Sequence, residues 1–412
     1  MHYTVGWFRI LFLAAGIMVP AGTWAQIDPM PRQMIQLGYN AAFQGHAPLS
    51  AYAFYYRNIP HFMQTNLALR MAIAPTYVDA ELGIREVLGE NTDLGIGIAG
   101  GGFADSYDEI RRGTFIPRES FVGHGGEISA SLYHCFNPGQ QIPLNGVMRG
   151  LVHYTAYEED DSTARTFPLP EDHPWAGIRT GLRWGGQEPI LFPSLAMELS
   201  VWYEGQFRGE HGRYGYTGVN PRGDRSMEDM SHLFWGQALL AYTFTNSGQS
   251  FYINLTGGTS IDADRFSAYR LGALLPLVSE FPLSLPGYYY QEISAEHFVM
   301  LGGNYTVALD SKGKWSANLV AATAGVDYLD GLEQPGQWHS GVGAGILYQA
   351  SSVKVMVGYA YGIDAIRSSG RGAHSIGFLM QMDLDHARRL LFSPQQPNRW
   401  RGFQRIFGAF GG

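Results

Sequence analysis

Two histidine–serine pairs are the residues of this sequence closest to hydrolase chemistry. His339 precedes Ser340, and His374 precedes Ser375. A serine nucleophile needs a histidine within hydrogen-bond reach. Adjacent residues of a β-strand point to opposite sides, so neither pair can form that bond in a regular strand. We therefore identify no catalytic residue, and a lipid-modifying hydrolase is kept only as an alternative function.

The sequence gives little support to a metal site, an internal disulfide or a nucleic-acid partner. The acidic cluster at 158–162 offers the oxygen ligands that Ca²⁺ prefers, but a solvated loop explains it more simply. Cys135 is the only cysteine, so an internal disulfide cannot form. The net charge of −8 lacks the basic character of a nucleic-acid-binding protein. We predict no metal, no cofactor and no nucleic-acid partner.

A set of charged residues suggests a polar interior. Two interpretations stay open: a lattice of ion pairs filling a lumen, or a constriction that selects permeants by charge. We expect the arginines along one side and the carboxylates opposite them. The predicted lumen-lining residues are the arginines Arg70, Arg85, Arg149, Arg179 and Arg183 and, opposite them, the carboxylates Glu81, Glu198, Glu204 and Asp383.

The elements that would position these residues are long alternating strands. In 353–363 the odd positions are Val, Tyr or Ile, whereas the even positions include Lys354 and three small residues. Segments 374–384 and 197–204 alternate in the same way. They run about 10 to 14 residues, and a tilted strand that crosses a bilayer needs ~9 to 11. With 53 glycines, 14% aromatics and only 16% charged residues, the pattern predicts a transmembrane antiparallel β-barrel.

Seventeen candidate strands can be counted, and bacterial barrels usually have an even number, so we predict about sixteen. Residues 66–87, broken at Pro75, can form either a hairpin of two strands or one bent strand. Aromatic residues at 52–56 and 359–361 are interpreted as interfacial girdles. Long extracellular loops are expected at 105–124, 158–175, 208–231 and 364–372. The predicted strands are 34–43, 50–59, 66–74, 76–87, 94–104, 125–136, 145–158, 176–186, 196–207, 232–244, 250–262, 266–275, 293–309, 315–329, 340–350, 353–363 and 373–384.

The two ends of the chain differ from this pattern. Residues 1–25 have one cation, a short apolar run and small residues at Thr23 and Ala25, which together predict a cleaved signal peptide. Residues 26–385 form the predicted barrel, without a periplasmic domain. Residues 386–412 form a basic, aromatic tail that could lie along the membrane or have no role. The predicted location is the bacterial outer membrane, and its lipid is the predicted partner.

Part of the chain resembles the bacterial surface antigen superfamily. The matching segments are 266–275, 285–292, 294–301, 324–328, 341–345 and 357–362. The superfamily includes BamA-like insertases, two-partner secretion pores and the barrels of patatin-like lipases, to which the likeness is closest. Its barrels carry a long loop whose Arg-Gly-aromatic tip folds into the lumen. Here Pro286, Gly287 and Tyr288 occupy the tip, so the tip arginine is absent, and Gln291 and Glu292 follow.

The resemblance implies that 276–292 is a lumen plug in a pore related to translocation and assembly barrels. Its composition, rich in proline and apolar residues, suits a rigid loop packed inside the barrel. A structural or surface-adhesive protein with a sealed lumen is the main alternative. Whether a protein or a small molecule passes through the pore is not encoded in any motif that we identify.

Overall fold

A computed structural model describes residues 30–140, 142–186, 190–215, 224–244, 247–273, 281–368 and 370–385. The predicted signal peptide and the predicted tail at 386–412 lie outside these residues, as does 276–280 of the predicted plug. Within the described residues, no helix is long and apolar enough to cross a membrane.

The fold is a closed antiparallel β-barrel. The main sheet contains 17 strands, and one of them, β16, is a three-residue strand paired only with β17, which leaves 16 in the wall. The first and last strands pair from Met34 with Asp383 to Ala42 with Ser375, so the sheet has no open edge. The predicted fold class is therefore confirmed. The wall strands are β1 (Arg32–Ala42), β2 (Ser50–Pro60), β3 (Leu67–Ile73), β4 (Tyr77–Ile84), β5 (Thr92–Gly101), β8 (Val122–Cys135), β9 (Leu144–Glu158), β10 (His173–Gly186), β11 (Leu195–Phe207), β14 (Met230–Thr243), β15 (Ser250–Ile261), β17 (Ile293–Ala308), β18 (Trp315–Tyr328), β19 (Trp338–Gln349), β20 (Val353–Arg367) and β21 (Gly370–Asp383).

The two faces of the wall have opposite polarity. On β11, Leu199 and Val201 are 52% and 57% exposed on the outer face, whereas Glu198 and Ser200 are buried inside. The same alternation recurs on other strands, where Ile253 and Val357 are exposed. An apolar exterior with a polar interior is the pattern of a barrel surrounded by lipid.

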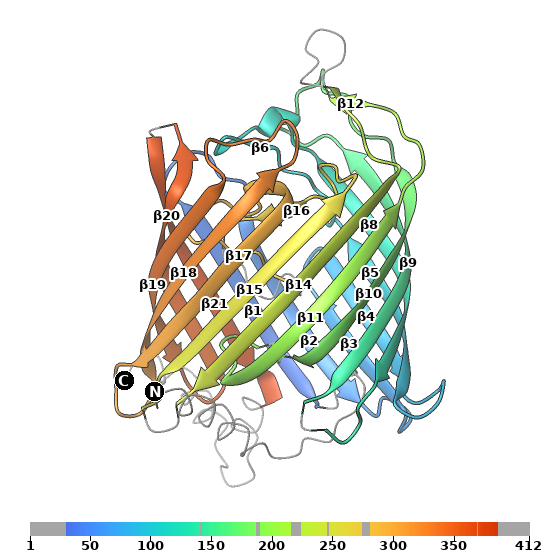
Figure 1. Ribbon diagram of the computed structural model, residues 1–412, viewed down its shortest axis with the longest axis vertical. Coiled ribbons are helices and arrows are strands. Elements are labelled where there is room, and N and C mark those ends of the chain that lie inside the picture. The colour runs from blue at the N-terminus through green and yellow to red at the C-terminus, as the bar shows by residue number, and fades with distance from the viewer. Residues whose placement is uncertain are drawn as a thin grey trace, which may run out of the picture.

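The connections alternate between the two ends of the barrel (Figure 1). One end, the short-turn end, has turns such as 61–66, 309–314 and 350–352. The other, the long-loop end, carries 102–121, 159–172, 208–229 and 262–292. Small elements lie in these loops: β6 (Ile110–Arg111), β7 (Thr114–Phe115), a 3-10 turn at Pro117–Glu119, β12 (Tyr214–Gly215), β13 (Asp224–Arg225) and β16 (Tyr269–Leu271). In outer-membrane barrels the short turns face the periplasm.

The sequence analysis assigned one strand and one loop wrongly. Segment 266–275 is not a wall strand, because only Tyr269–Leu271 pairs, and it does so within the loop that joins β15 to β17. Residues 364–372 are not a long loop, because β20 continues to Arg367 and β21 begins at Gly370. Of the two possibilities for 66–87, the structure shows the hairpin, since all of β3 pairs with Val78–Ile84 of β4.

Candidate functional site in the barrel lumen

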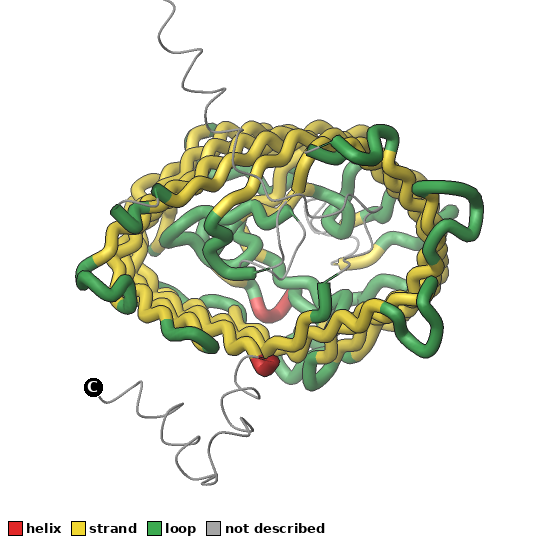
Figure 2. The backbone as a smooth tube through the Cα atoms, turned by 90° about the horizontal axis from the view of Figure 1, so that it is seen from below, coloured by secondary structure: helices red, strands yellow, loops and turns green. Residues whose placement is uncertain are grey.

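The lumen contains residues 281–292, which we call the lumen loop. Viewed along the barrel, loop segments cross the interior of the oval wall (Figure 2). The loop tip packs against β19 and β20 from inside. A Cβ built on Gly287 would lie 1.9 Å from the backbone nitrogen of Gly362, and one on Gly341 would lie 2.0 Å from the carbonyl oxygen of Pro286. Only glycine on both sides allows so close an approach.

A buried ion pair holds the return limb of the lumen loop. Arg367, at the end of β20, donates hydrogen bonds of 2.8 and 2.9 Å to the two carboxylate oxygens of Glu292. The Arg367 guanidinium also lies 3.7 Å from the ring centroid of Tyr289. The backbone N–H of Tyr289 donates to Glu292 at 2.7 Å. The loop is thus bound to the wall through a pair whose two side chains are at most 1% exposed.

The tip is enclosed by a second set of contacts. Tyr288 is fully buried and its hydroxyl lies 3.3 Å from Nδ1 of His339. Nε2 of His339 contacts the hydroxyl of Tyr328 at 2.5 Å, while the neighbouring Ser340 bonds to Thr323. His339 therefore supports the loop tip.

The other end of the lumen loop is anchored on a different part of the wall. The Phe281 ring lies 5.4 Å from Trp202 on β11 and 5.7 Å from Trp235 on β14. Arg183 lies over Trp202, 5.0 Å from its ring centroid, and Arg179 lies 5.6 Å from that of Trp235. With its tip on β19 and β20, the loop is attached to the wall at two separate places.

A second inward segment narrows the short-turn end. Residues 190–193, between β10 and β11, reach the wall formed by β20 and β21. The Leu191 N–H donates to Gln381 at 2.8 Å, and Nζ of Lys354 donates to the Leu191 carbonyl at 2.7 Å. The Leu191 side chain is buried against Met356 and Leu379. No sequence motif marks this segment, because its partners lie more than 150 positions away.

A cavity of ≈ 2020 Å³ remains beside the lumen loop. It extends from residues near the short-turn end, such as Asn58 and Thr306, to Ser106 and Asp160 in the loops of the opposite end. Gln291 of the lumen loop lines it. Six of the predicted lumen-lining residues also line it: Arg70, Glu81, Arg149, Arg179, Arg183 and Glu198.

The other three predicted lumen-lining residues do not border this cavity. Arg85 is in the turn between β4 and β5, and Asp383 ends β21, where its N–H donates to the Ser352 carbonyl at 2.7 Å. Glu204 accepts a hydrogen bond of 2.8 Å from Nε of Arg179. None of these three is among the described residues that line the cavity.

The expected separation of arginines and carboxylates on opposite sides was wrong. Arg179 on β10 and Glu204 on β11 are direct partners in the sheet register. Arg183 lies 3.4 Å from Glu198 on the same two strands, and Arg149 on β9 pairs with Glu127 on β8. Opposite charges alternate on neighbouring strands because an unpaired charge in the lumen would be costly. Glu127 was missed although it occupies an inward position of its strand.

Four long loops form a packed cover that we call the loop dome: 102–121, 159–172 and the described parts of 208–229 and 262–273. At its centre Glu109 is fully buried and lies 3.3 Å from each of Arg111, Arg225 and Arg265. The Tyr107 hydroxyl donates to Glu109 at 2.6 Å. Burial alone would raise the pKa of Glu109, but the arginines outweigh it and hold the pKa below the ordinary value of 4.5.

Aromatic packing and a further carboxylate fix the dome to the wall. Phe121 stacks on Tyr107 at 5.6 Å and contacts Tyr214 edge-on at 6.3 Å. Asp105 accepts hydrogen bonds from His153 at 2.7 Å and Thr155 at 2.6 Å, both on β9. Burial opposes ionisation of Asp105, but these hydrogen bonds lower its pKa overall. The dome is therefore a structured surface.

The remaining candidates from the sequence lie in structural contacts. In the acidic cluster, Ser162 donates to Asp160 within a turn, and Glu158 pairs with His124 at 2.8 Å. His374 is bonded to the Tyr359 hydroxyl on the neighbouring strand, and Ser375 is fully buried.

The sequence and the fold were compared with those of known proteins. No protein-family model matches the chain, and no curated protein sequence matches it. Among solved structures, CdiB from Acinetobacter baumannii is similar over 86% of this chain and 60% of its own, with a TM-score of 0.57 and 9% identity. CdiB from Escherichia coli is similar over 86% of this chain and 63% of its own, with a TM-score of 0.56 and 12% identity. The fold is that of a BamA-like outer-membrane barrel.

BamA itself supports this assignment. The BamA structure from Haemophilus ducreyi, which lacks POTRA domains 1–3, is similar over 85% of this chain and 70% of its own, with a TM-score of 0.50 and 11% identity. This chain spans about three fifths of the CdiB structures it resembles. At such identities the likeness shows a shared BamA-like fold alone, and the predicted closeness to patatin-linked barrels stays a prediction.

Proposed function

We propose that this protein is an outer-membrane pore of the translocation and assembly type, with the lumen loop as its plug. The observation that carries the proposal is the attachment of the loop to β19 and β20 through Gly287 and the Glu292–Arg367 pair. A loop fixed at two places but bordered by a cavity has space beside it, so it can be displaced without unfolding the wall. The BamA-like fold supports the same class.

Single-channel conductance in planar bilayers tests the plug. Two variants are compared with the unaltered protein: one lacks 281–290, and the other carries a glycine–serine linker of equal length there. The linker variant keeps the connection between β15 and β17 and removes the anchors at Phe281 and Gly287. We expect low conductance from the unaltered protein and a several-fold increase in both variants. Silence of all three, with folding shown by heat-modifiable migration, would contradict the proposal.

The loop dome favours a second candidate, a surface-adhesive protein. A dome ordered by the buried Glu109 cluster presents a fixed outer surface to which a partner can bind. This candidate predicts unchanged conductance in the linker variant together with binding of the intact protein to a cell or matrix surface. Removal of that binding by a linker in place of 159–172 would support it.

A further inference from the structure

Aromatic residues that the sequence analysis placed in the membrane girdle line the lumen instead. Tyr52, Phe54 and Tyr56 occupy alternate positions of β2, and all three border the cavity. The Tyr52 and Phe54 rings stack at 5.6 Å with an interplanar angle of 27°. Tyr55, between them, does not line the cavity, and its hydroxyl accepts a hydrogen bond from Gln33. We call Tyr52, Phe54 and Tyr56 the aromatic ladder.

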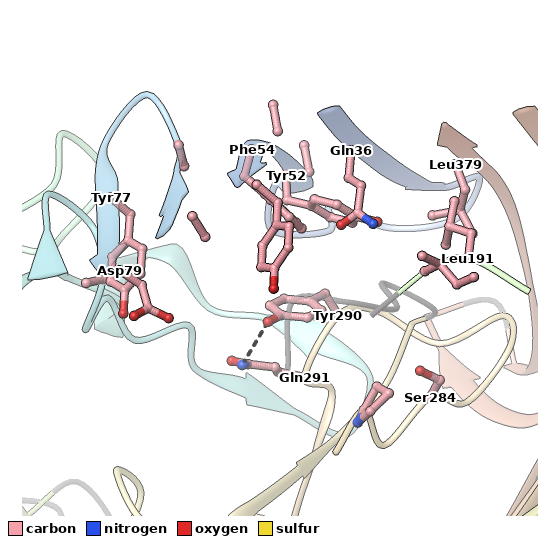
Figure 3. Close-up of a pocket in the computed structure, with 18 of the residues that line it drawn as sticks. Gln36, Tyr52, Phe54, Tyr77, Asp79, Leu191, Ser284, Tyr290, Gln291 and Leu379 are labelled. Atoms are coloured by element: carbon pink, nitrogen blue, oxygen red, sulfur yellow. Dashed lines mark hydrogen bonds between the residues drawn. The ribbon is translucent and has the colours of Figure 1, made fainter. Parts of the chain in front are cut away.

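The lumen loop presents its own polar and aromatic groups to this ladder. Figure 3 shows Tyr52 and Phe54 on one side of the cavity, with Tyr290 and Gln291 of the lumen loop on the other. The Gln291 side-chain amide donates to the Tyr290 hydroxyl at 3.2 Å. The cavity is therefore bounded by aromatic rings on two sides, one set in the wall and one in the loop.

The charges along the cavity cancel. Its described lining contains five arginines and five carboxylates, and no lysine or histidine. Arg70 lies 3.7 Å from Asp79, and their side chains remain 42% and 34% exposed. A site for an anion or a cation would carry an excess of one sign. The arginines and carboxylates instead provide hydrogen-bond donors and acceptors without an excess of either charge.

Amide groups add to this hydrogen-bonding surface. The lining includes Gln36, Asn58, Asn254, Gln291, Asn304 and Asn318. Three lining residues carry a buried polar group without a hydrogen-bond partner within the described residues: the Tyr52 hydroxyl, Nε of Arg149 and the indole N–H of Trp202, a residue only 5% exposed. Buried groups of this kind are normally satisfied, so each needs a water molecule or a small shift of its side chain toward the cavity to gain a partner.

We infer that the lumen binds a neutral oligosaccharide. Sugar rings have an apolar face that stacks on aromatic rings and a rim of hydroxyls that both donate and accept hydrogen bonds. The aromatic ladder and Tyr290 supply stacking surfaces, and the paired charges and amides supply the hydrogen bonds. The chain of rings on one strand, spaced by two residues, fits a linear chain of sugar units better than a single ring.

Isothermal titration of the full chain refolded in a detergent without a sugar head group tests the inference. The probes are maltohexaose, cellohexaose, hexalysine and hexaglutamate. We expect at least one of the two neutral oligosaccharides to bind and neither charged peptide to bind. The double variant Tyr52→Ala with Phe54→Ala should weaken that binding about 10-fold, as expected from the loss of two ring contacts. Tyr55→Ala, on the same strand, is the matched control and should bind as the unaltered protein does.

Three results would overturn the inference: no binding of either neutral oligosaccharide to folded protein, equal or tighter binding of a charged peptide, or equal affinity in the double variant and the unaltered protein. If the double variant fails to fold, Tyr290→Ala in the lumen loop replaces it with the same expectation. The inference does not depend on the plug, because titration measures binding whereas the conductance experiment measures passage. If the conductance experiment contradicts the plug, the titration still tests sugar binding, and if the titration contradicts sugar binding, the conductance experiment still tests the plug.

Discussion

Arg367 and Glu292 are 75 residues apart in the sequence and form a two-bonded ion pair inside the barrel, with oxygens 2.8 and 2.9 Å from the guanidinium nitrogens. The sequence resemblance implies an arginine at the loop tip, where this chain has Pro286. In this barrel the wall supplies the cation and the loop supplies the carboxylate. The return limb of the loop is therefore held by this ion pair, whereas the tip is held by the backbone contact of Gly287 and by the contact of Tyr288 with His339.

Replacement of Arg367 by glutamine should release the lumen loop. It leaves the Glu292 carboxylate buried without its cation, which costs about 3–5 kcal/mol. We expect more frequent open events in planar bilayers and faster cleavage of the loop by an added protease. Arg371→Gln is the control, because its pair with Asp364 is exposed at 65% on the arginine side and such pairs contribute about 1 kcal/mol or less. Equal effects of the two substitutions would show that the Arg367–Glu292 pair does not hold the lumen loop in place.

Addition of one methyl group at the loop tip should have a similar effect. Gly287→Ala puts a Cβ within 1.9 Å of the Gly362 nitrogen and forces an L-residue to φ +86°. The matched control is Gly139→Ala, where φ is +83° and no atom lies within 4 Å of the new Cβ. Backbone strain is thus equal, and only the contact differs. We expect higher conductance for the first variant alone; a parallel rise in both would assign the effect to strain.

Acid should loosen the loop dome. The pKa of Glu109 in the folded protein lies below its ordinary value of 4.5, so ionised Glu109 stabilises the dome fully above that pH. The stabilisation is lost as the pH falls through the lowered pKa, and Asp105, whose pKa is also lowered, acts in the same direction. Near-ultraviolet circular dichroism of the aromatic packing should therefore stay constant down to about pH 4.5 and decline below it.

Glu109→Gln serves as the comparison for this titration. The variant cannot ionise at that position and leaves three arginines facing a neutral amide, so the aromatic signal should already be weak at neutral pH. Its remaining decline in acid should be shallower than that of the unaltered protein. An identical titration curve for the two proteins would show that Glu109 does not control the dome.

The assignment of the two faces of the wall can be tested with adjacent residues of β15. Leu255 is 48% exposed on the outer face, and Asn254 lines the cavity. Leu255→Lys should cost ~2–4 kcal/mol near the middle of the bilayer, and Asn254→Lys much less. Urea unfolding of protein inserted in lipid vesicles measures both. A larger loss for Asn254→Lys would reverse the facing assignment of this strand.

Strand positions and facing could be predicted from the sequence because lipid and lumen impose opposite polarity on a period of two. Glu198 and Ser200 alternate with Leu199 and Val201, and this contrast alone fixes which side is inside. No knowledge of the neighbouring strands is needed. The closed barrel follows from many strands of this kind, since each must pair on both edges in a membrane.

Local alternation did not suffice where a loop is also buried. Tyr269 and Leu271 alternate with Arg270 as in a wall strand. They nevertheless belong to the loop between β15 and β17, and they pack against the lumen loop and the inner side of the wall. The aromatic residues of β2 offered no contrast either, because Tyr55 and the ladder residues on the opposite side are of one chemical type. Only the sheet register places Phe54 in the lumen and Tyr55 on the other face.

The partners inside the lumen were decided by the tertiary structure alone. The sequence identified Glu292 as a loop residue of interest but assigned Arg367 to an exposed loop, so their pairing could not be foreseen. The same holds for Lys354 and the carbonyl of Leu191, which 163 positions separate. Contacts across a barrel depend on how far around the circumference each strand lies, and that position is set only when the first and last strands close the sheet.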